Sequence, residues 1–168
     1  LMPFGSCPFG DERVAEMGYL DIINRARRNV HIFTPYLILD NQLATALTFA
    51  ARRGVEVVLI LPHIPDKKTI FALAKTYYPQ LLEGGVRIYE YTPCFVHAKV
   101  FVGDGREAVV GTINFDYRSL YLHFECGVYM ERTGAVEQVE ADIQDTLRSC
   151  QPVTLAQCRS RRLIDKLI

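Results

Sequence analysis

The sequence predicts an α/β fold in which a mixed β-sheet lies between layers of helices. Segments with apolar residues at helical spacing alternate along the chain with short runs rich in Val, Ile and Leu. This alternation is typical of strands that are covered by helices on both faces. Hydrophobic residues make up 49% of the 168 residues, which is enough apolar surface to cover such a sheet. A chain of this length is expected to form one domain, here residues 1–168, with a core of its own.

The first part of the chain contains three predicted helices, each followed by a predicted strand. In residues 11–28 the apolar side chains recur at helical spacing. Residues 30–34 are an apolar run that ends before Pro35, and Gly54 is expected to cap the second helix. In chain order the expected elements are a strand at 1–4, a helix at 11–28, a strand at 30–34, a helix at 41–53, a strand at 55–61, a helix at 67–82 and a strand at 86–91.

A hairpin is expected next. Residues 95–102 are predicted to form a strand, in which every second residue points to the same face. Residues 108–113 are an apolar return strand, and the Asp-Gly pair at 104–105 suits a two-residue turn. His97 and Lys99 therefore share one face of the first strand. The opposite face is expected to join the core through Val96, Ala98, Val100 and Val102.

The pairing of the two hairpin strands follows from the turn. A two-residue turn places His97 opposite Thr112, with Asn114 one step along the same face. Cross-strand partners lie ~5 Å apart at their Cβ atoms. The hairpin is therefore expected to present His97, Lys99, Thr112 and Asn114 to one small ligand.

Beyond the hairpin the alternation of helix and strand continues. A basic amphipathic segment is expected at the end of the sequence. The remaining elements are a short helix at 116–121, a strand at 124–130, a helix from 134 to about 150 and the basic tail at 155–168.

Residues 97–114 carry the pattern H-x-K-x4-D-x6-G-T-x-N. It combines an imidazole, an ammonium, a hydroxyl and a carboxamide in one hairpin. Such a set can attack a phosphoryl group, balance its charge and donate hydrogen bonds to it without a metal ion. An ordinary hairpin with polar residues facing water predicts no such spacing, so the pattern favours a site for phosphoryl chemistry.

The pattern resembles the HKD motif of the phospholipase D superfamily. Further segments resemble the C-terminal half of bacterial cardiolipin synthases, so that the resemblance covers nearly the whole chain. These segments are FTPY at 33–36, RRGVEV at 52–57, LP at 61–62, PDKK at 65–68, GVRIYEY at 85–91, NFDYRS at 114–119 and LHFE at 122–125.

The resemblance implies a phospholipase D-like α-β-α sandwich with a mixed central sheet. Family members usually carry two HKD motifs on one longer chain, whereas this sequence contains one H-x-K. Residues 1–168 are therefore expected to be the C-terminal half of a two-motif enzyme. The implied activity is transfer of a phosphatidyl group between two phosphatidylglycerols, which yields cardiolipin and glycerol through a phosphohistidine.

The resemblance also implies roles for single residues. His97 is the expected nucleophile or general acid, and its ordinary pKa of ~6.5 suits either duty. Lys99 is expected to neutralise the phosphoryl oxygens, while Thr112 and Asn114 bind them. Glu125 is expected to pair with the His97 imidazole and to fix its tautomer.

Asp104 is the third letter of the motif and belongs to the expected catalytic set. A turn aspartate, however, typically accepts hydrogen bonds from backbone amides, which gives Asp104 a structural interpretation as well. Lys67 and Lys68 are candidates for contact with a lipid headgroup or for a solvated helix start. The remaining histidines lack a lysine partner and are interpreted as structural, namely His31, His63 and His123.

The charge balance and the cysteine pattern of the sequence bear on whether the chain binds nucleic acid, a cofactor or a metal ion. Nineteen basic and nineteen acidic residues give a formal net charge of zero, which argues against a nonspecific nucleic-acid binder. Five cysteines without close pairing suggest reduced thiols in a cytosolic setting, and no metal-ligand spacing occurs. We therefore expect no cofactor and no metal ion.

The longest apolar runs, such as 57–61, are far shorter than the ~20 residues that span a bilayer. The chain is accordingly expected to be soluble. The resemblance implies that its parent protein is held at the cytoplasmic side of the cell membrane by N-terminal segments. The expected partners are phosphatidylglycerol and either the N-terminal HKD half or a homodimer partner.

Two further functions remain open at the level of sequence. The first is a nuclease or phosphodiesterase in which two copies of a single-motif chain build one site. The second is an inactive half that contributes to folding or assembly alone.

Overall fold

The computed structural model describes residues 1–10 and 12–164, with the side chains of 161–164 left aside. In this part of the chain the main sheet has eight strands in the order β1-β9-β7-β6-β2-β4-β5-β10. Neighbours among β2, β4 and β5 are parallel and the other pairs are antiparallel, so the sheet is mixed as predicted. The strands are β1 (Met2–Ser6), β2 (Asn29–Phe33), β4 (Glu56–Pro62), β5 (Arg87–Tyr91), β6 (Val100–Gly103), β7 (Glu107–Gly111), β9 (Glu125–Glu131) and β10 (Cys150–Pro152).

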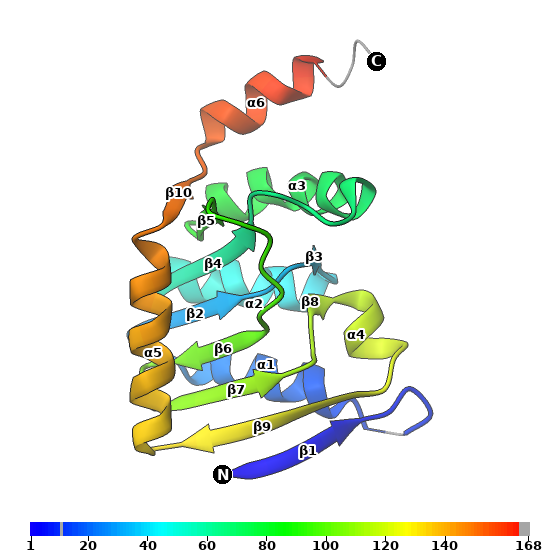
Figure 1. The fold of residues 1–168 in the computed structure, drawn as a ribbon, viewed down its shortest axis with the longest axis vertical. Helices are drawn as coiled ribbons and strands as arrows, with labels where there is room; N and C mark the ends of the chain where they lie inside the picture. The colour runs from blue at the N-terminus through cyan, green and yellow to red at the C-terminus, as the bar shows by residue number, and fades with distance from the viewer. Residues whose placement is uncertain (11, 165–168) are drawn as a thin grey trace.

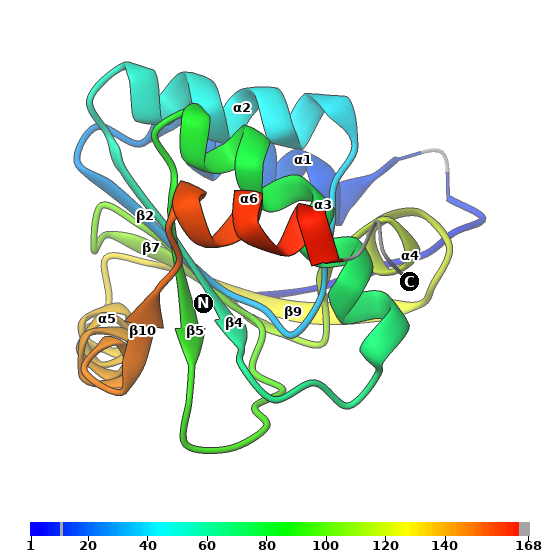
Figure 2. The same cartoon turned by 90° about the horizontal axis from the view of Figure 1, so that it is seen from above.

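Helices cover both faces of this sheet, which makes the fold an α-β-α sandwich (Figures 1 and 2). Three helices and the segment α6 lie on one side, and α5 runs across the strands on the other. They are α1 (Val14–Arg25), α2 (Asn41–Arg52), α3 (Lys68–Glu83) and α6 (Leu155–Ile164), opposed by α5 (Gly134–Leu147). None of the described helices combines the length and apolar character needed to cross a bilayer.

Two apolar clusters fill the space between the layers. The larger lies under α1, α2 and α3, where the Tyr19 ring stacks on Phe101 with centroids 4.5 Å apart. The smaller lies under α5 and contains the fully buried Val102. Three partly buried residues predicted to share the face of Val102 pack against the same cluster, namely Val96, Ala98 and Val100. The predicted core face of the hairpin is therefore confirmed.

The predicted pairing of the hairpin is wrong by one residue. Strand β6 begins at Val100 rather than at residue 95, and Gly103 pairs with Glu107. The connection contains Arg106 in addition to the Asp-Gly pair. The Arg106 N–H still donates to the Gly103 carbonyl at 2.9 Å, but the Arg106 carbonyl accepts from the Arg132 N–H at 2.7 Å, on the side of β7 away from β6. One added residue shifts all cross-strand partners, so His97 is not opposite Thr112.

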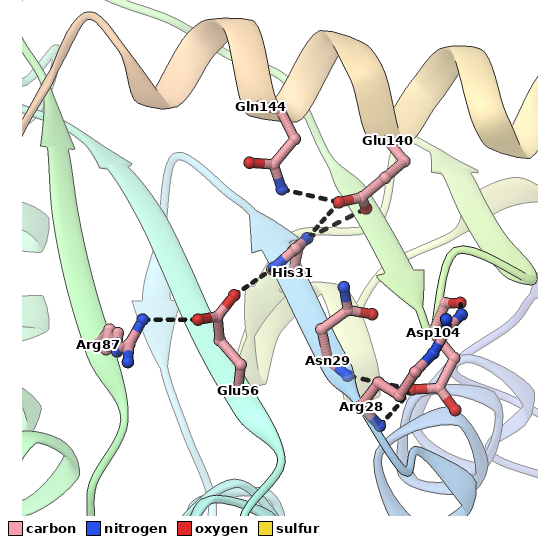
Figure 3. A network of polar contacts seen from close by, with 8 residues as sticks. All are labelled: Arg28, Asn29, His31, Glu56, Arg87, Asp104, Glu140 and Gln144. Atoms are coloured by element: carbon pink, nitrogen blue, oxygen red, sulfur yellow. Dashed lines mark hydrogen bonds and ion pairs between the residues drawn. The ribbon is translucent and has the colours of Figure 1, made fainter.

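Helix α1 is shorter than the predicted helix at 11–28. It begins at Val14, and Asp11 lies outside the described residues. It ends at Arg25: the Ala26 N–H still bonds the Ile22 carbonyl, but the two amides after it are used elsewhere. The Arg27 N–H donates to the Asp104 carboxylate at 2.9 Å, at the far end of β6. The Arg28 N–H donates to the same carboxylate at 2.7 Å (Figure 3).

The end of the chain also differs from prediction. The helix expected to reach residue 150 ends at Leu147, and β10 follows as an edge strand paired with β5. The basic tail is helical over Leu155–Ile164, and its last residues, 165–168, lie outside the described part.

His31 joins α5 to the sheet (Figure 3). Its side chain is 1% exposed, and its ring nitrogens face two carboxylates, with Nδ1 2.8 Å from Glu140 of α5 and Nε2 3.5 Å from Glu56 of β4. Glu56 in turn pairs with Arg87 of β5, at 2.5 Å. The imidazole thus holds a helix against two neighbouring strands.

Candidate active site

The candidate residues other than Asp104 lie at one edge of the main sheet, in two groups of contacts. Phe33 at the end of β2 pairs with Val100 at the start of β6, and β7 ends beside the start of β9. A small parallel sheet of β3 (Leu37–Ile38) and β8 (Phe115–Asp116) and the short helix α4 (Tyr117–Tyr121) lie beyond that edge (Figure 1). In α/β sheets ligands bind at the edge where the parallel strands end, which is where β2 ends here.

His97 and Lys99 lie in the segment that leads into β6. The Lys99 Nζ atom is 2.8 Å from His97 Nδ1 and donates to the His97 carbonyl oxygen at 2.6 Å. An ammonium has only protons to donate, so Nδ1 is the acceptor of this contact. The proton of the neutral ring is therefore on Nε2, and the ring is exposed to solvent.

Burial and charge favour the neutral form of this imidazole. Partial burial lowers the pKa of His97. The positive charges of Lys99 and Lys67 lower this pKa further, whereas the Asp66 carboxylate raises it. Burial also lowers the pKa of Lys99, against the carboxylates of Glu125, Asp116 and Asp66. With a pKa below ~6.5 the imidazole is mainly neutral at pH 7.

Two residues beside His97 were not predicted as site residues. The Tyr36 ring meets the imidazole edge to face, with centroids 5.9 Å apart, and its hydroxyl donates to Asp66 Oδ2 at 2.6 Å. Lys67, a candidate from the sequence, lies with Nζ 5.6 Å from the centre of the Tyr36 ring. The signals for these residues were the segments FTPY and PDKK, which carry no spacing relation to the HKD motif.

Thr112, Asn114 and Glu125 form a second group of contacts. The Thr112 hydroxyl donates to Glu125 Oε2, and the Ser119 hydroxyl donates to Oε1 at 2.9 Å. The Asn114 Nδ2 donates to Ser119 Oγ at 3.0 Å. Ser119, which sequence reasoning missed, thus connects the carboxamide of the motif to the carboxylate.

The expected pair of Glu125 and His97 is not formed in the described part of the chain. Glu125 Oε1 instead lies 3.1 Å from Nδ1 of His123, a residue interpreted as structural. Strand β7 separates β9, which begins at Glu125, from β6, which follows His97 and Lys99. Glu125 acts on the first group through its charge, which raises the pKa of Lys99 against the larger effect of burial.

Asp104 lies away from both groups, at the other end of β6. Its carboxylate accepts hydrogen bonds from three consecutive backbone amides. Figure 3 shows two of these donors, Arg28 and Asn29, the latter at 3.0 Å. Partial burial raises the pKa of Asp104, but these N–H donors outweigh it and leave the pKa below its ordinary value. These contacts match the structural interpretation of Asp104, because they tie the hairpin turn to the start of β2.

The donor set fits an anionic phosphoryl ligand better than a metal ion. Among the described residues no three His, Cys, Asp or Glu side chains are grouped so that they could hold a cation. The groups at the edge are an ammonium, an imidazole, hydroxyls and a carboxamide, which are donors to phosphoryl oxygens.

The chain is similar in sequence to cardiolipin synthases. The family described as "Cardiolipin synthase, PLD-like domain" matches residues 19–147. A protein of Streptococcus mutans, described only as uncharacterized, is 53% identical over 168 residues, which is 100% of this chain and 36% of that protein. A cardiolipin synthase of Geobacillus sp. is 36% identical over 150 residues, which is 89% of this chain and 30% of that enzyme. The chain thus spans about a third of the length of these curated relatives.

Solved structures share the fold. The phospholipase D family member Nuc from Salmonella typhimurium superposes with a TM-score of 0.73 at 19% identity, over 90% of this chain and 99% of Nuc. Phosphatidylserine synthase from Haemophilus influenzae superposes with a TM-score of 0.71 at 16% identity, over 90% of this chain and 39% of that enzyme. The motif, the sandwich and the family match over most of its length agree, and the chain belongs to the family of cardiolipin synthase, phospholipase D-like domains.

Proposed function

We propose that this chain is the C-terminal phosphatidyltransferase half of a cardiolipin synthase that condenses two phosphatidylglycerols into cardiolipin and glycerol. The observation that carries the proposal is the contact of 2.8 Å between the Lys99 ammonium and the His97 imidazole at the edge where β2 ends. It joins a nitrogen that can react at phosphorus to a positive charge that can hold the phosphoryl oxygens.

Substrate binding changes the partner of Lys99 in this proposal. The phosphoryl oxygens of a lipid carry negative charge and compete with His97 Nδ1 for the ammonium. Once Lys99 moves to the phosphate, Nδ1 is free to carry a proton and Nε2 can present its lone pair. Asn114 has a second N–H beyond the one donated to Ser119, and this N–H is available to the same oxygens.

The first half-reaction breaks the bond to glycerol. A neutral imidazole nitrogen forms a bond to phosphorus, the P–O bond to the glycerol headgroup breaks, and a second imidazole gives its proton to the leaving oxygen. In the second half-reaction, a hydroxyl of another phosphatidylglycerol bonds to phosphorus. The P–N bond then breaks and its electrons return to the imidazole, while the hydroxyl proton passes to the second imidazole.

The two imidazoles act on opposite sides of phosphorus, so one HKD motif supplies only one of them. We place the second on an N-terminal HKD half of the same protein, because the chain spans about a third of its curated relatives. His97 is then either the nucleophile or the acid. This parent protein would work at the cytoplasmic side of the cell membrane, where its lipid substrate is found.

A second candidate is a phosphodiesterase or nuclease built from two copies of this chain. It is favoured by the coverage of 99% of Nuc, a chain of similar extent to this one. The zero formal net charge weighs against nucleic acid as the substrate.

The test supplies labelled phosphatidylglycerol, with a chelator present, to membranes that contain the full-length protein. Cardiolipin and glycerol are expected in equal amounts, and His97→Ala should lower both at least about a hundredfold. His63→Gln, which removes an imidazole bonded to Glu90 outside the site, is the matched control. Phosphatidic acid and glycerol as the only products would make the protein a hydrolase, and cleavage of nucleic acid would favour the second candidate.

A further inference from the structure

Tyr36 and Asp66 form a hydrogen-bonded pair against the His97 ring, although they come from different loops. Tyr36 follows β2, and Asp66 lies between β4 and α3. The Tyr36 hydroxyl occupies one carboxylate oxygen, Oδ2, at 2.6 Å. Asp66 is exposed, and among the side chains described, up to residue 160, the structure records no hydrogen bond to its other oxygen, Oδ1. A ligand at His97 can therefore reach this oxygen.

The position of Tyr36 is held from inside the fold. The Thr34 hydroxyl, on a residue that is 1% exposed, donates to the Tyr36 carbonyl at 2.9 Å and accepts from the Phe115 N–H at 3.0 Å. Phe115 directly follows Asn114 of the motif. One buried hydroxyl thus fixes the loop of Tyr36 relative to the loop that carries the carboxamide.

The charge of Asp66 is felt by both reacting groups. After burial and Lys99, which lower the pKa of His97, Asp66 is the group that raises it. Asp66 also raises the pKa of Lys99, after the effects of burial, Glu125 and Asp116. A carboxylate that acts on both side chains belongs to the same site as they do.

A transferase must choose an alcohol over water in its second half-reaction. The glycerol headgroup has two neighbouring hydroxyls, of which one attacks phosphorus and the other is left to be recognised. A carboxylate oxygen is a strong acceptor for such a hydroxyl. In the proposed reaction Lys99 and Asn114 bind the phosphoryl oxygens, which are the same whether an alcohol or water attacks. Another group must therefore recognise the acceptor alcohol.

We infer that Asp66, held by Tyr36, is a specificity-determining residue that accepts a hydrogen bond from the second hydroxyl of the acceptor. The acceptor class is thereby a vicinal diol, such as the glycerol headgroup of phosphatidylglycerol. This inference rests on the proposed transferase function. Asp66 orients the diol, while the attacking hydroxyl bonds to phosphorus, the P–N bond breaks and the proton passes to the second imidazole.

The test lets two alcohols compete for one phosphatidyl group. The full-length protein receives phosphatidylglycerol vesicles with equal concentrations of 1,2-propanediol and 1-propanol, which differ by one hydroxyl. The ratio of phosphatidylpropanediol to phosphatidylpropanol should favour the diol about tenfold, the effect of one hydrogen bond to a charged group. Asp66→Asn should lower the ratio severalfold, because a carboxamide oxygen is a neutral and weaker acceptor than a carboxylate. Tyr36→Phe, which keeps the ring and loses the hydroxyl, should lower it partway.

The ratio is measured within one reaction, so it is independent of the amount of folded enzyme. Asp145→Asn is the matched control, because Asp145 is an exposed carboxylate of α5 paired with Arg148, and it should leave the ratio unchanged. An equal preference of the wild type for both alcohols, or an unchanged ratio in Asp66→Asn, overturns the inference alone. Absence of both alcohol products and of cardiolipin in the wild type overturns the proposed function, and the inference with it.

Discussion

The Lys99 ammonium determines the state of the His97 imidazole before a substrate arrives. It lies on Nδ1 at 2.8 Å and, together with burial, keeps the pKa of the ring below its ordinary value. In the proposed reaction this side chain has two successive partners, first the imidazole and then the phosphoryl oxygens. Two changes at the level of residues separate the reacting groups from the supporting ones.

Lys99→Gln should raise the pKa of His97, because it removes a positive charge beside the ring. A titration of the imidazole C–H signals by NMR in the 168-residue chain measures this shift, with Lys68→Gln as the control. In the full-length enzyme the same change should lower kcat by about 10²–10³, as the loss of one preorganised donor does. A pKa of His97 that falls or stays constant would contradict the assigned contact.

Asp104→Asn should lower stability while the reactive state of His97 stays the same. The change weakens hydrogen bonds from backbone amides to a charged acceptor, which costs about 1.5–3 kcal/mol. Since the folded pKa of Asp104 is lowered, its contribution is present above the unfolded pKa of ~3.9 and is lost as pH falls through the folded value. Urea denaturation at several pH values measures both effects, and an altered pKa of His97 in this variant would speak for a catalytic role.

At the scale of elements, the site depends on close contact between β7 and β9. Gly111 of the motif pairs with Gly127, and a Cβ atom at position 111 would lie 2.2 Å from the Cys126 carbonyl oxygen. The motif needs a glycine at this position because a Cβ atom would clash with backbone atoms of β9, and these cannot move away as a flexible side chain could.

Gly111→Ala should separate the two strands beside Thr112 and Glu125. We expect a loss of about 1–3 kcal/mol in the free energy of unfolding, the range for overpacked sites. Hydrogen exchange should accelerate at the amides of Thr112 and Cys126, which bond to Cys126 O and Thr112 Oγ1. Gly134→Ala is the control, because a Cβ there meets nothing within 4 Å. Equal stability of both variants would refute the close contact.

The attachment of α5 is expected to weaken as pH rises. Burial lowers the pKa of His31, but the carboxylates of Glu140 and Glu56 raise it above its ordinary value. Two carboxylates face the ring, Glu140 of α5 and Glu56 of β4, and Glu56 is itself paired with Arg87 of β5. On the other neighbouring strand, β6, the residue opposite His31 is the apolar Val102. The stabilisation is therefore complete below the unfolded pKa of ~6.5 and is lost as pH rises through the folded value.

Glu140→Gln tests this attachment. The free energy of unfolding of this variant should vary less with pH above ~6.5 than that of the wild type, because the His31 imidazolium loses Glu140, the nearer of its two carboxylates. Hydrogen exchange in α5 should show the same loss of pH dependence. An identical pH dependence in both proteins would exclude His31 as its source.

At the scale of the whole molecule, one domain supplies only one of the two histidines that the proposed displacement at phosphorus needs. The described chain brings a single histidine–lysine pair to the edge of the sheet. Since displacement at phosphorus needs a nucleophile on one side and an acid on the other, a monomer of this chain lacks a group that the proposed reaction requires.

The isolated 168-residue chain should have no transferase activity as a monomer. Any activity of a homodimer should fall as the square of the wild-type fraction when wild-type chains are mixed with His97→Ala chains, because each site then needs both histidines. Sedimentation and a phosphatidylglycerol assay on the same samples measure this relation. A linear decrease, or turnover by a monomeric sample, would mean that one histidine is sufficient.

The sequence by itself determined the alternation of helix and strand, the core face of the hairpin at Val102 and the placement of His97 and Lys99 on one side of the chain. These features depend on residues that are close in the chain, where side-chain period and spacing are decided by local geometry. Only the tertiary structure decided the hairpin register, in which Gly103 pairs with Glu107 and the Arg106 carbonyl accepts from the N–H of Arg132, just after β9. The tertiary structure also decided that the Glu125 carboxylate contacts Thr112, Ser119 and His123. It likewise placed Tyr36 between Asp66, to which its hydroxyl donates, and the His97 ring. Contacts of this kind follow from the order of strands in the sheet and from loops that meet at its edge, and no local pattern in the sequence encodes them.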